Sequence, residues 1–188
     1  LPASVKTIGS YAFCGNAFAE VTIPAGVETL GDGVFAYCQN LQNIRVASGS
    51  ANYCAVDGVL FSASKAVLVQ YPAGRSGAYQ VPAYVTTVAP SAFDGGALDD
   101  VTILATVTDV GCYAFEGCES LTNVVIGSGI KVLSEGVFSG CVSLPNVAIP
   151  ASVTNIDCYA FCSCSGLTSI TIPGTVESVG EQAFGECT

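Results

Sequence analysis

The sequence predicts a repeat solenoid: a right-handed coil of short parallel β-strands joined by short helical turns and interrupted by one atypical β-hairpin-like repeat. Three observations lead to this fold class. An Ala-Phe or Val-Phe phrase returns every 22 or 23 residues, a strand-like phrase follows each copy, and 51% of the 188 residues are hydrophobic. A single unit of this size cannot bury its apolar side, so the units must stack into one array.

The Phe of the first phrase sets the register of the array. In the C-terminal half it recurs every 23 residues, at Phe115, Phe138, Phe161 and Phe184. Earlier copies lie at Phe13, Phe35 and Phe93, with 22 residues between Phe13 and Phe35. Five copies carry a Cys three residues later, namely Cys38, Cys118, Cys141, Cys164 and Cys187. We expect a single helical turn around each Phe.

The second phrase is Leu-x-x-Val/Ile-x-Val/Ile, as in Leu41-Ile44-Val46 and Leu144-Val147-Ile149. Its last two positions alternate as a half-buried strand requires. A Pro often follows, and it would end the ladder because it lacks an N–H group. A shorter β-prone piece comes next, such as 153–156. Stacked units would place equivalent strands about 4.8 Å apart, with continuous apolar ladders inside.

The repeat is interrupted between Phe35 and Phe93, which are 58 residues apart. We therefore divide the single array into two repeats over 1–46, an atypical insert over 47–80, and about five repeats over 81–188, the last incomplete. Within the insert, 56–61 and 66–71 are β-rich, and 62–65 suits a longer hairpin connection. We expect an atypical repeat that continues the core rather than a dedicated binding loop. Arg75-Ser76-Gly77 is the most loop-like stretch and the expected protrusion.

One complete unit suggests a family. The string from Ile149 to Pro173, IPASVTNIDCYAFCSCSGLTSITIP, resembles the BspA-like leucine-rich repeat of bacterial and protozoan surface antigens, and about seven such units cover the chain. The resemblance implies a leucine-rich-repeat solenoid on a surface or secreted protein that binds host or matrix components. It also implies that the recurring Cys points inward and hydrogen-bonds neighbouring backbone. The last unit stops before its strand, so we expect a fragment, or ends that meet another copy.

The cysteines leave two other readings open. A disulfide between equivalent Cys is close enough, but parallel side chains do not suit its dihedral angle. Zinc at Cys158, Cys162 and Cys164 with Cys141 conflicts with the usual spacing of two to four residues between paired ligands. Asp99 and Asp100 are too few ligands for calcium, which takes six to eight oxygens. We therefore expect mostly free cysteines, no metal and no cofactor.

Composition restricts function. Fifteen acidic and five basic residues give a net charge of −10, which argues against nucleic acid and against an anionic membrane surface. The chain has no His, the commonest general base and imidazole ligand. It carries no nucleophile-elbow or phosphate-loop motif, and no run of 18 apolar residues that would insert into a membrane. We therefore expect a chain that is not an enzyme.

Binding is expected on the concave sheet, at the strand positions that do not enter the apolar ladders. The candidate residues are Glu20, Asn43, Arg45, Asp99, Asp100, Asn123, Asn146 and Ser169. Such a strip could hold a protein, a peptide or a glycan, although the same residues could also be simply solvated. The recurring Tyr is expected on the outer rim. We expect an extracellular or cell-surface adhesion module. Many free thiols favour the alternative, a cytoplasmic interaction scaffold.

Overall fold

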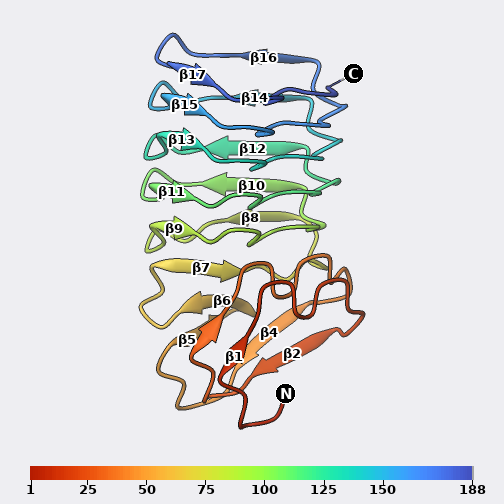
Figure 1. The fold of residues 1–188 in the computed structure, drawn as a ribbon, viewed down its shortest axis with the longest axis vertical. Helices are drawn as coiled ribbons and strands as arrows, with labels where there is room; N and C mark the ends of the chain where they lie inside the picture. Colours follow the sequence, from red (N-terminus) through yellow and green to blue (C-terminus); the bar gives the residue numbers. More distant parts are fainter. Residues whose placement is uncertain (188) are drawn as a thin grey trace.

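The structure, a computed structural model that describes residues 1–187, is a β-solenoid whose units stack along one axis (Figure 1). Each regular unit contributes one longer strand to one side. These are β2 (Glu20–Ile23), β4 (Asn43–Val46), β10 (Asp100–Ile103), β12 (Asn123–Ile126), β14 (Asn146–Ala148) and β16 (Ser169–Thr171). β8 (Ala78–Gln80) occupies the same place directly after the interruption. The solenoid prediction is confirmed.

A short strand on the opposite side completes each unit. These are β1 (Thr7–Ile8), β3 (Thr29–Leu30), β9 (Thr87–Val88), β11 (Asp109–Val110), β13 (Val132–Leu133), β15 (Asn155–Ile156) and β17 (Ser178–Val179). All pairs between units are parallel and in register, as at Val101 opposite Val124 and Val147 opposite Ile170. The strands end near the expected prolines; for example β2 stops at Ile23, before Pro24.

The interruption contains three strands, β5 (Tyr53–Val56), β6 (Val59–Ser62) and β7 (Val67–Gln70), which pair antiparallel in this order. The expected hairpin across 62–65 is present as the β6–β7 pair. β5 and the tight turn before β6 were not predicted from the sequence. At this turn Asp57 and Gly58 have φ of 48° and 74°, as a two-residue hairpin turn requires, and Asp-Gly is a strong signal for it.

The molecule divides at this interruption into regions with different sheets. We call residues 1–46 the N-terminal block, residues 47–77 the connecting segment and residues 78–187 the column. In the column the long strands form one sheet in the order β16-β14-β12-β10-β8, whereas the block has a separate β2-β4 sheet. Figure 1 shows the block strands running obliquely to those of the column. The long-strand sheet is therefore split where the sequence repeat is interrupted.

Two apolar clusters underlie this division. One contains Phe35 and Leu41 of the block together with Leu60 of β6. The other runs through the column and contains Phe61 from the same strand. Because successive strand residues face opposite sides, β6 sends Leu60 into one cluster and Phe61 into the other, and both are 1% exposed. The connecting segment therefore continues the core, as expected.

The expectation of a helical turn around each Phe was wrong, because no segment of residues 1–187 is helical. The backbone there folds into turns whose N–H groups alternate between two kinds of partner. Phe115 and Gly117 donate to Val137 and Ser139 of the next unit, at 2.9 and 2.8 Å, whereas Cys118 donates within its own turn. Tyr113 has a φ of 57°, which breaks any right-handed helix. Stacking between units replaces the helical hydrogen bonds.

Candidate functional site

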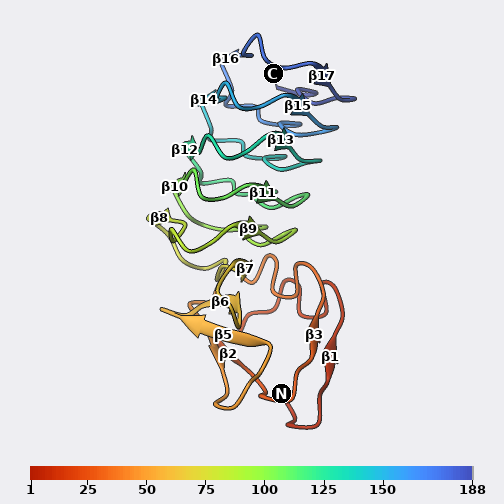
Figure 2. The same ribbon diagram turned by 90° about the vertical axis from the view of Figure 1, so that its left-hand side faces the viewer.

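The predicted strip lies on the face formed by the long strands, which we call the long-strand face. Figure 2 shows β8 to β16 on one side of the column and β9 to β17 on the other. The successive long strands follow an almost straight line in this view, so the face is shallow. Alternation along β12 leaves Asn123 and Val125 exposed while Val124 and Ile126 are buried. The strand pattern alone therefore determines which side chains reach solvent.

Three of the candidate residues lie together on the N-terminal block. Arg45 lies opposite Thr22, two positions along the β2–β4 pair from Glu20, and the side chains of Arg45 and Glu20 form a diagonal ion pair with a 2.9 Å N–O distance. Both side chains are more than half exposed, so this pair contributes little to stability. Asn43 is half-buried, and its Oδ1 accepts a hydrogen bond from Arg75 at 2.9 Å. Asn43 is therefore engaged in a structural contact and is only partly exposed.

The other five candidates lie on the column. Asn123 donates from Nδ2 to the Asp100 carboxylate at 2.7 Å, while Asn146 and Ser169 are directly opposite each other on β14 and β16. Asp99, Asn123, Asn146 and Ser169 are exposed, and Asp100 is partly exposed. Asp100, Asn123, Asn146 and Ser169 occupy equivalent positions of neighbouring strands and form one polar row, and Asp99 directly precedes β10. These five residues do not join the three residues of the block, because the connecting segment lies between β4 and β8.

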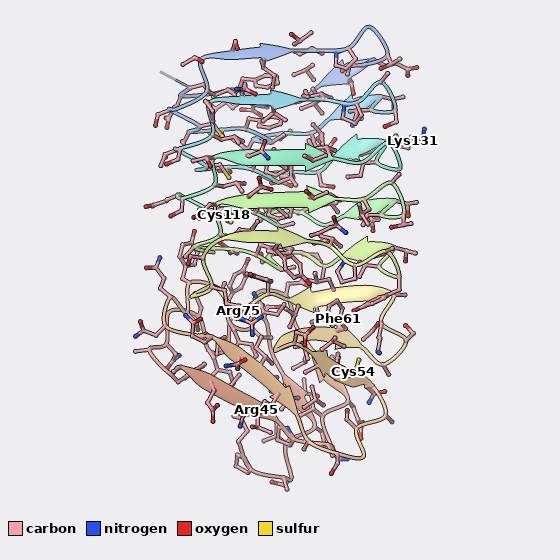
Figure 3. All side chains as sticks on the ribbon, turned by 180° about the vertical axis from the view of Figure 1, so that it is seen from behind. Arg45, Cys54, Phe61, Arg75, Cys118 and Lys131 are labelled. Atoms are coloured by element: carbon pink, nitrogen blue, oxygen red, sulfur yellow. The ribbon has the colours of Figure 1, made fainter. Side chains whose placement is uncertain are left out.

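Arg75 holds this junction together, and the sequence analysis did not anticipate it. Its Nε and one terminal nitrogen donate to the carbonyls of Gln42 and Asp57, both at 2.6 Å, and the other terminal nitrogen donates to Asn43. The expected protrusion at 75–77 therefore does not hold for the Arg75 side chain, which folds back onto β4 and the hairpin turn. Figure 3 shows Arg75 between the two sheets. Its acceptors are scattered in sequence, so no local motif reveals them.

The recurring cysteines form a ladder of hydrogen bonds inside the solenoid. Each Sγ donates to the carbonyl of the Phe one unit earlier at 3.0 to 3.3 Å, in the pairs Cys38–Phe13, Cys118–Phe93, Cys141–Phe115, Cys164–Phe138 and Cys187–Phe161. Burial raises the pKa of the Cys118 thiol to about 12, so this thiol stays protonated and unreactive. The structural role expected for this position is confirmed, and all ten cysteines are free thiols.

The structure also bears on metal binding, on the recurring tyrosines and on membrane spanning. Within residues 1–187, no three His, Cys, Asp or Glu side chains are arranged to hold a metal ion. Two of the recurring tyrosines, Tyr11 and Tyr113, pack against a glycine of the following unit. The Tyr113 ring covers Gly136, where a Cβ would lie 2.3 Å from it, and its hydroxyl donates to Glu135. No helix among the described residues has the length and apolarity that crossing a bilayer requires.

One carboxylate, Asp94 in the turn that follows Phe93, is buried. Asp94 is 1% exposed, and its Oδ1 has no hydrogen-bond partner. Burial, together with the nearby Glu116 carboxylate, raises the pKa of Asp94 to about 7, while Tyr37 and Ser91 act in the opposite direction. Tyr37 belongs to the block and Glu116 to the column, so Asp94 lies where the turns of the two regions meet.

The family follows from comparison with known proteins. The model of the BspA type leucine rich repeat region matches residues 1–65 and 86–188 in six copies. The chain belongs to this family. None of the curated proteins matches it.

Solved structures agree with this assignment. A leucine rich cell surface protein from Faecalibacterium prausnitzii is 36% identical, with a TM-score of 0.90 over 99% of this chain and 50% of its own. The pneumococcal vaccine antigen PcpA shares the fold at 23% identity, with a TM-score of 0.86 over 97% of this chain and 47% of its own. A leucine-rich-repeat protein of T. pallidum is 28% identical over 68% of this chain and 63% of its own, with a TM-score of 0.62. The chain spans about half the length of the first two.

Proposed function

We propose that this chain is a non-catalytic binding and adhesion module of a cell-surface or secreted protein. It presents the long-strand face to a protein, peptide or glycan partner. The observation that carries the proposal is the row of solvent-facing polar side chains at Asp100, Asn123, Asn146 and Ser169, which occupy equivalent positions of a parallel sheet. Solenoids bind partners through such extended surfaces. The family membership and the likeness to a protein titled as a cell surface protein support the surface location.

The binding strip of the column is tested by a fourfold variant, in which Asp100, Asn123, Asn146 and Ser169 are each replaced by Ala. The probe is an array of extracellular-matrix proteins and neutral and acidic glycans. We expect at least one array member to bind the unaltered chain, and its affinity for the variant to fall at least about tenfold, since these side chains supply the polar contacts. Binding is measured by surface plasmon resonance, with circular dichroism as the check on folding.

A matched control replaces four residues at the opposite, short-strand side: Asp109, Lys131, Glu177 and Ser178, each changed to Ala. All four are exposed, so this variant should bind like the unaltered chain. Equal binding by both variants would contradict the proposed surface.

The ten free thiols favour a second candidate, an intracellular interaction scaffold. Extracellular proteins usually oxidise their cysteine pairs. The two candidates are separated by the cellular location of the full-length protein, determined by protease shaving of intact cells. Release of peptides from residues 1–188 by the protease supports the surface module, and their protection supports the scaffold.

A further inference from the structure

The long-strand face has a hollow of about 190 Å³ at the junction between the connecting segment and the column. Phe61, Tyr79 and Tyr84 line it with aromatic surface, and Asp57 and Gln80 add polar groups. Phe61 and Tyr84 meet edge to face with their ring centroids 5.8 Å apart, and Lys65 lies 5.9 Å from the Tyr84 ring. Figure 3 shows Phe61 in the region between β6 and the column. The hollow has room for one large side chain.

A free strand edge borders this hollow. β8 is the terminal strand of its sheet, with β10 as its one neighbour among residues 1–187. Gly77 and Val81 make their ladder hydrogen bonds with Asp99 and Thr102, on the β10 side. By the alternation of a parallel ladder, the N–H and C=O groups of Ala78 and Gln80 point the other way, toward the hairpin turn.

The hairpin turn does not satisfy this edge. The carbonyl of Gly58 accepts its hydrogen bond from the N–H of Ile44, at 2.9 Å, so the turn pairs with β4 of the block. Figure 2 shows the β5–β6 turn reaching the same side of the molecule as β8. Ala78 and Gln80 are both exposed. An unpaired edge beside an aromatic hollow combines the two features by which peptides are captured as added strands.

We infer that this edge and hollow bind an extended segment of a partner protein, which adds to β8 as a further strand. One large apolar side chain of the segment fills the hollow, between Tyr79 and Tyr84. Asp57 and Asp99 place exposed carboxylates beside the site. The Arg75 guanidinium also lines the hollow, but its nitrogens are hydrogen-bonded to Gln42, Asn43 and Asp57. In a chain of net charge −10, Lys or Arg beside the anchor completes the match. The inference deepens the proposed function by specifying a partner segment, and it rests on that function.

The peptide is favoured over a sugar by the backbone. A sugar could stack on Tyr84, but it has no regular row of donors and acceptors to pair with Ala78 and Gln80. A strand has such a row, with every second N–H and C=O on the same edge. Its side chains also alternate, so one points into the hollow while the next points away.

The test uses blocked heptapeptides Gly-Lys-Val-Z-Val-Lys-Gly, where Z is Leu, Phe, Tyr or Asp, carrying fluorescein. Fluorescence polarisation with the full chain should show saturable binding when Z is Leu, Phe or Tyr, and binding at least about tenfold weaker when Z is Asp. The substitution Tyr84→Ala should weaken the best peptide about tenfold. Tyr159→Ala, which changes a Tyr away from the hollow, is the matched control and should leave it unchanged.

Strand addition itself is tested on the peptide, so that the protein need not change. Methylating the backbone nitrogens on the edge that pairs with β8 should abolish binding, whereas methylating those on the other edge should preserve it. The peptide amides that become protected from hydrogen exchange on binding identify the paired edge of the peptide, and the Ala78 and Gln80 amides should become protected at the same time. The inference is overturned if no peptide saturates below about 1 mM, or if binding leaves both amides unprotected.

These outcomes are separable from those of the proposed function. The fourfold strip variant should lose matrix or glycan partners through the column, whereas Tyr84→Ala should lose the peptide. A chain that binds an array member through the strip but none of the peptides refutes only the inference. A neutral oligosaccharide that binds in a Tyr84-dependent way, in place of the peptides, also overturns it.

Discussion

The N-terminal block and the column are built from the same repeat, yet their Phe rings stack to different extents. In the column the Phe rings stack in an unbroken series, with centroids 4.5 to 5.4 Å apart from Phe93 to Phe184. In the block only Phe13 and Phe35 stack, at 5.8 Å, and the series then stops. Tyr71 of the connecting segment stacks on Phe93 at 5.0 Å and forms the base of the column. The Phe rings inside the column therefore have a stacked neighbour on both sides, whereas Phe13 and Phe35 have one each.

A buried Gln replaces the backbone acceptor that Phe35 lacks at the junction of the two regions, where the Tyr37 N–H still donates to the Asp94 carbonyl. The side chain of Gln70 is 1% exposed and accepts from the Phe35 N–H at 3.5 Å. It also donates to the Ala92 carbonyl at 3.1 Å. In the regular repeat, a backbone carbonyl of the next unit accepts from the N–H of the Phe. The block is therefore coupled to the column by a few polar contacts, while its apolar core stays separate. Four predictions test this comparison.

The largest effect should come from truncating a central Phe. Phe138→Ala removes a ring that is 1% exposed and stacked on both sides, which should cost about 3–5 kcal/mol of unfolding free energy. Phe13→Ala, at a half-buried ring with one stacked neighbour, should cost about 1–2 kcal/mol. Urea unfolding followed by circular dichroism measures both. Equal losses would show that the block and the column are equally well packed.

Gln70→Leu should uncouple the block from the column. The substitution keeps the side-chain volume but leaves the Phe35 N–H buried without a partner, which should cost about 2–3 kcal/mol. We expect the unfolding curve to separate into two transitions, with the block unfolding first. Hydrogen exchange at Ile44 and Val124 reports the two regions independently. If Gln70→Leu unfolds in one cooperative transition at unchanged urea concentration, the polar coupling is not important.

Asp94 should make this junction sensitive to pH. Its folded pKa is raised to about 7 from a usual 3.8, so its contribution to stability is complete below about pH 4 and is lost as the pH rises through 7. Asp94→Asn removes the charge and should stabilise the chain by about 1–2 kcal/mol at pH 8, with little change at pH 4. Melting curves at both pH values measure the difference. Glu116→Gln, beside Asp94, should reproduce part of the effect, whereas a gain that does not vary with pH would contradict it.

The smallest effect should come from one step of the cysteine ladder. Cys141→Ala removes the buried donor to the Phe115 carbonyl and should cost about 1 kcal/mol. Cys112→Ala is the control, because Cys112 is exposed and should change stability by less than about 0.5 kcal/mol. Cys38→Ala, at the equivalent position of the block, should resemble Cys141→Ala if the ladder works alike in both regions. Thermal unfolding compares the three variants.

The part of the candidate site that could be predicted is the part that follows from periodicity. Asn123, Asn146 and Ser169 repeat at a constant spacing, so alternation along the strand places them on the same exposed face. Arg75 and Gln70 could not be found in this way, because each contacts atoms of residues 18 to 35 positions away that share no pattern. The Asp-Gly turn was locally encoded and was overlooked. The absence of helical turns depended on hydrogen bonds between units, which no single unit reveals.

By itself, the sequence determined the solenoid, its family, the inward cysteines and the residues that face solvent. Each of these follows from a repeat in which equivalent side chains must occupy equivalent environments. Only the tertiary structure decided that the long-strand sheet is split between β4 and β8, that β6 supplies Leu60 to one core and Phe61 to the other, and that Arg75 closes the gap. The split lies where the repeat is interrupted. The contacts there join segments that share no repeat position, so the sequence period cannot predict which residues come together.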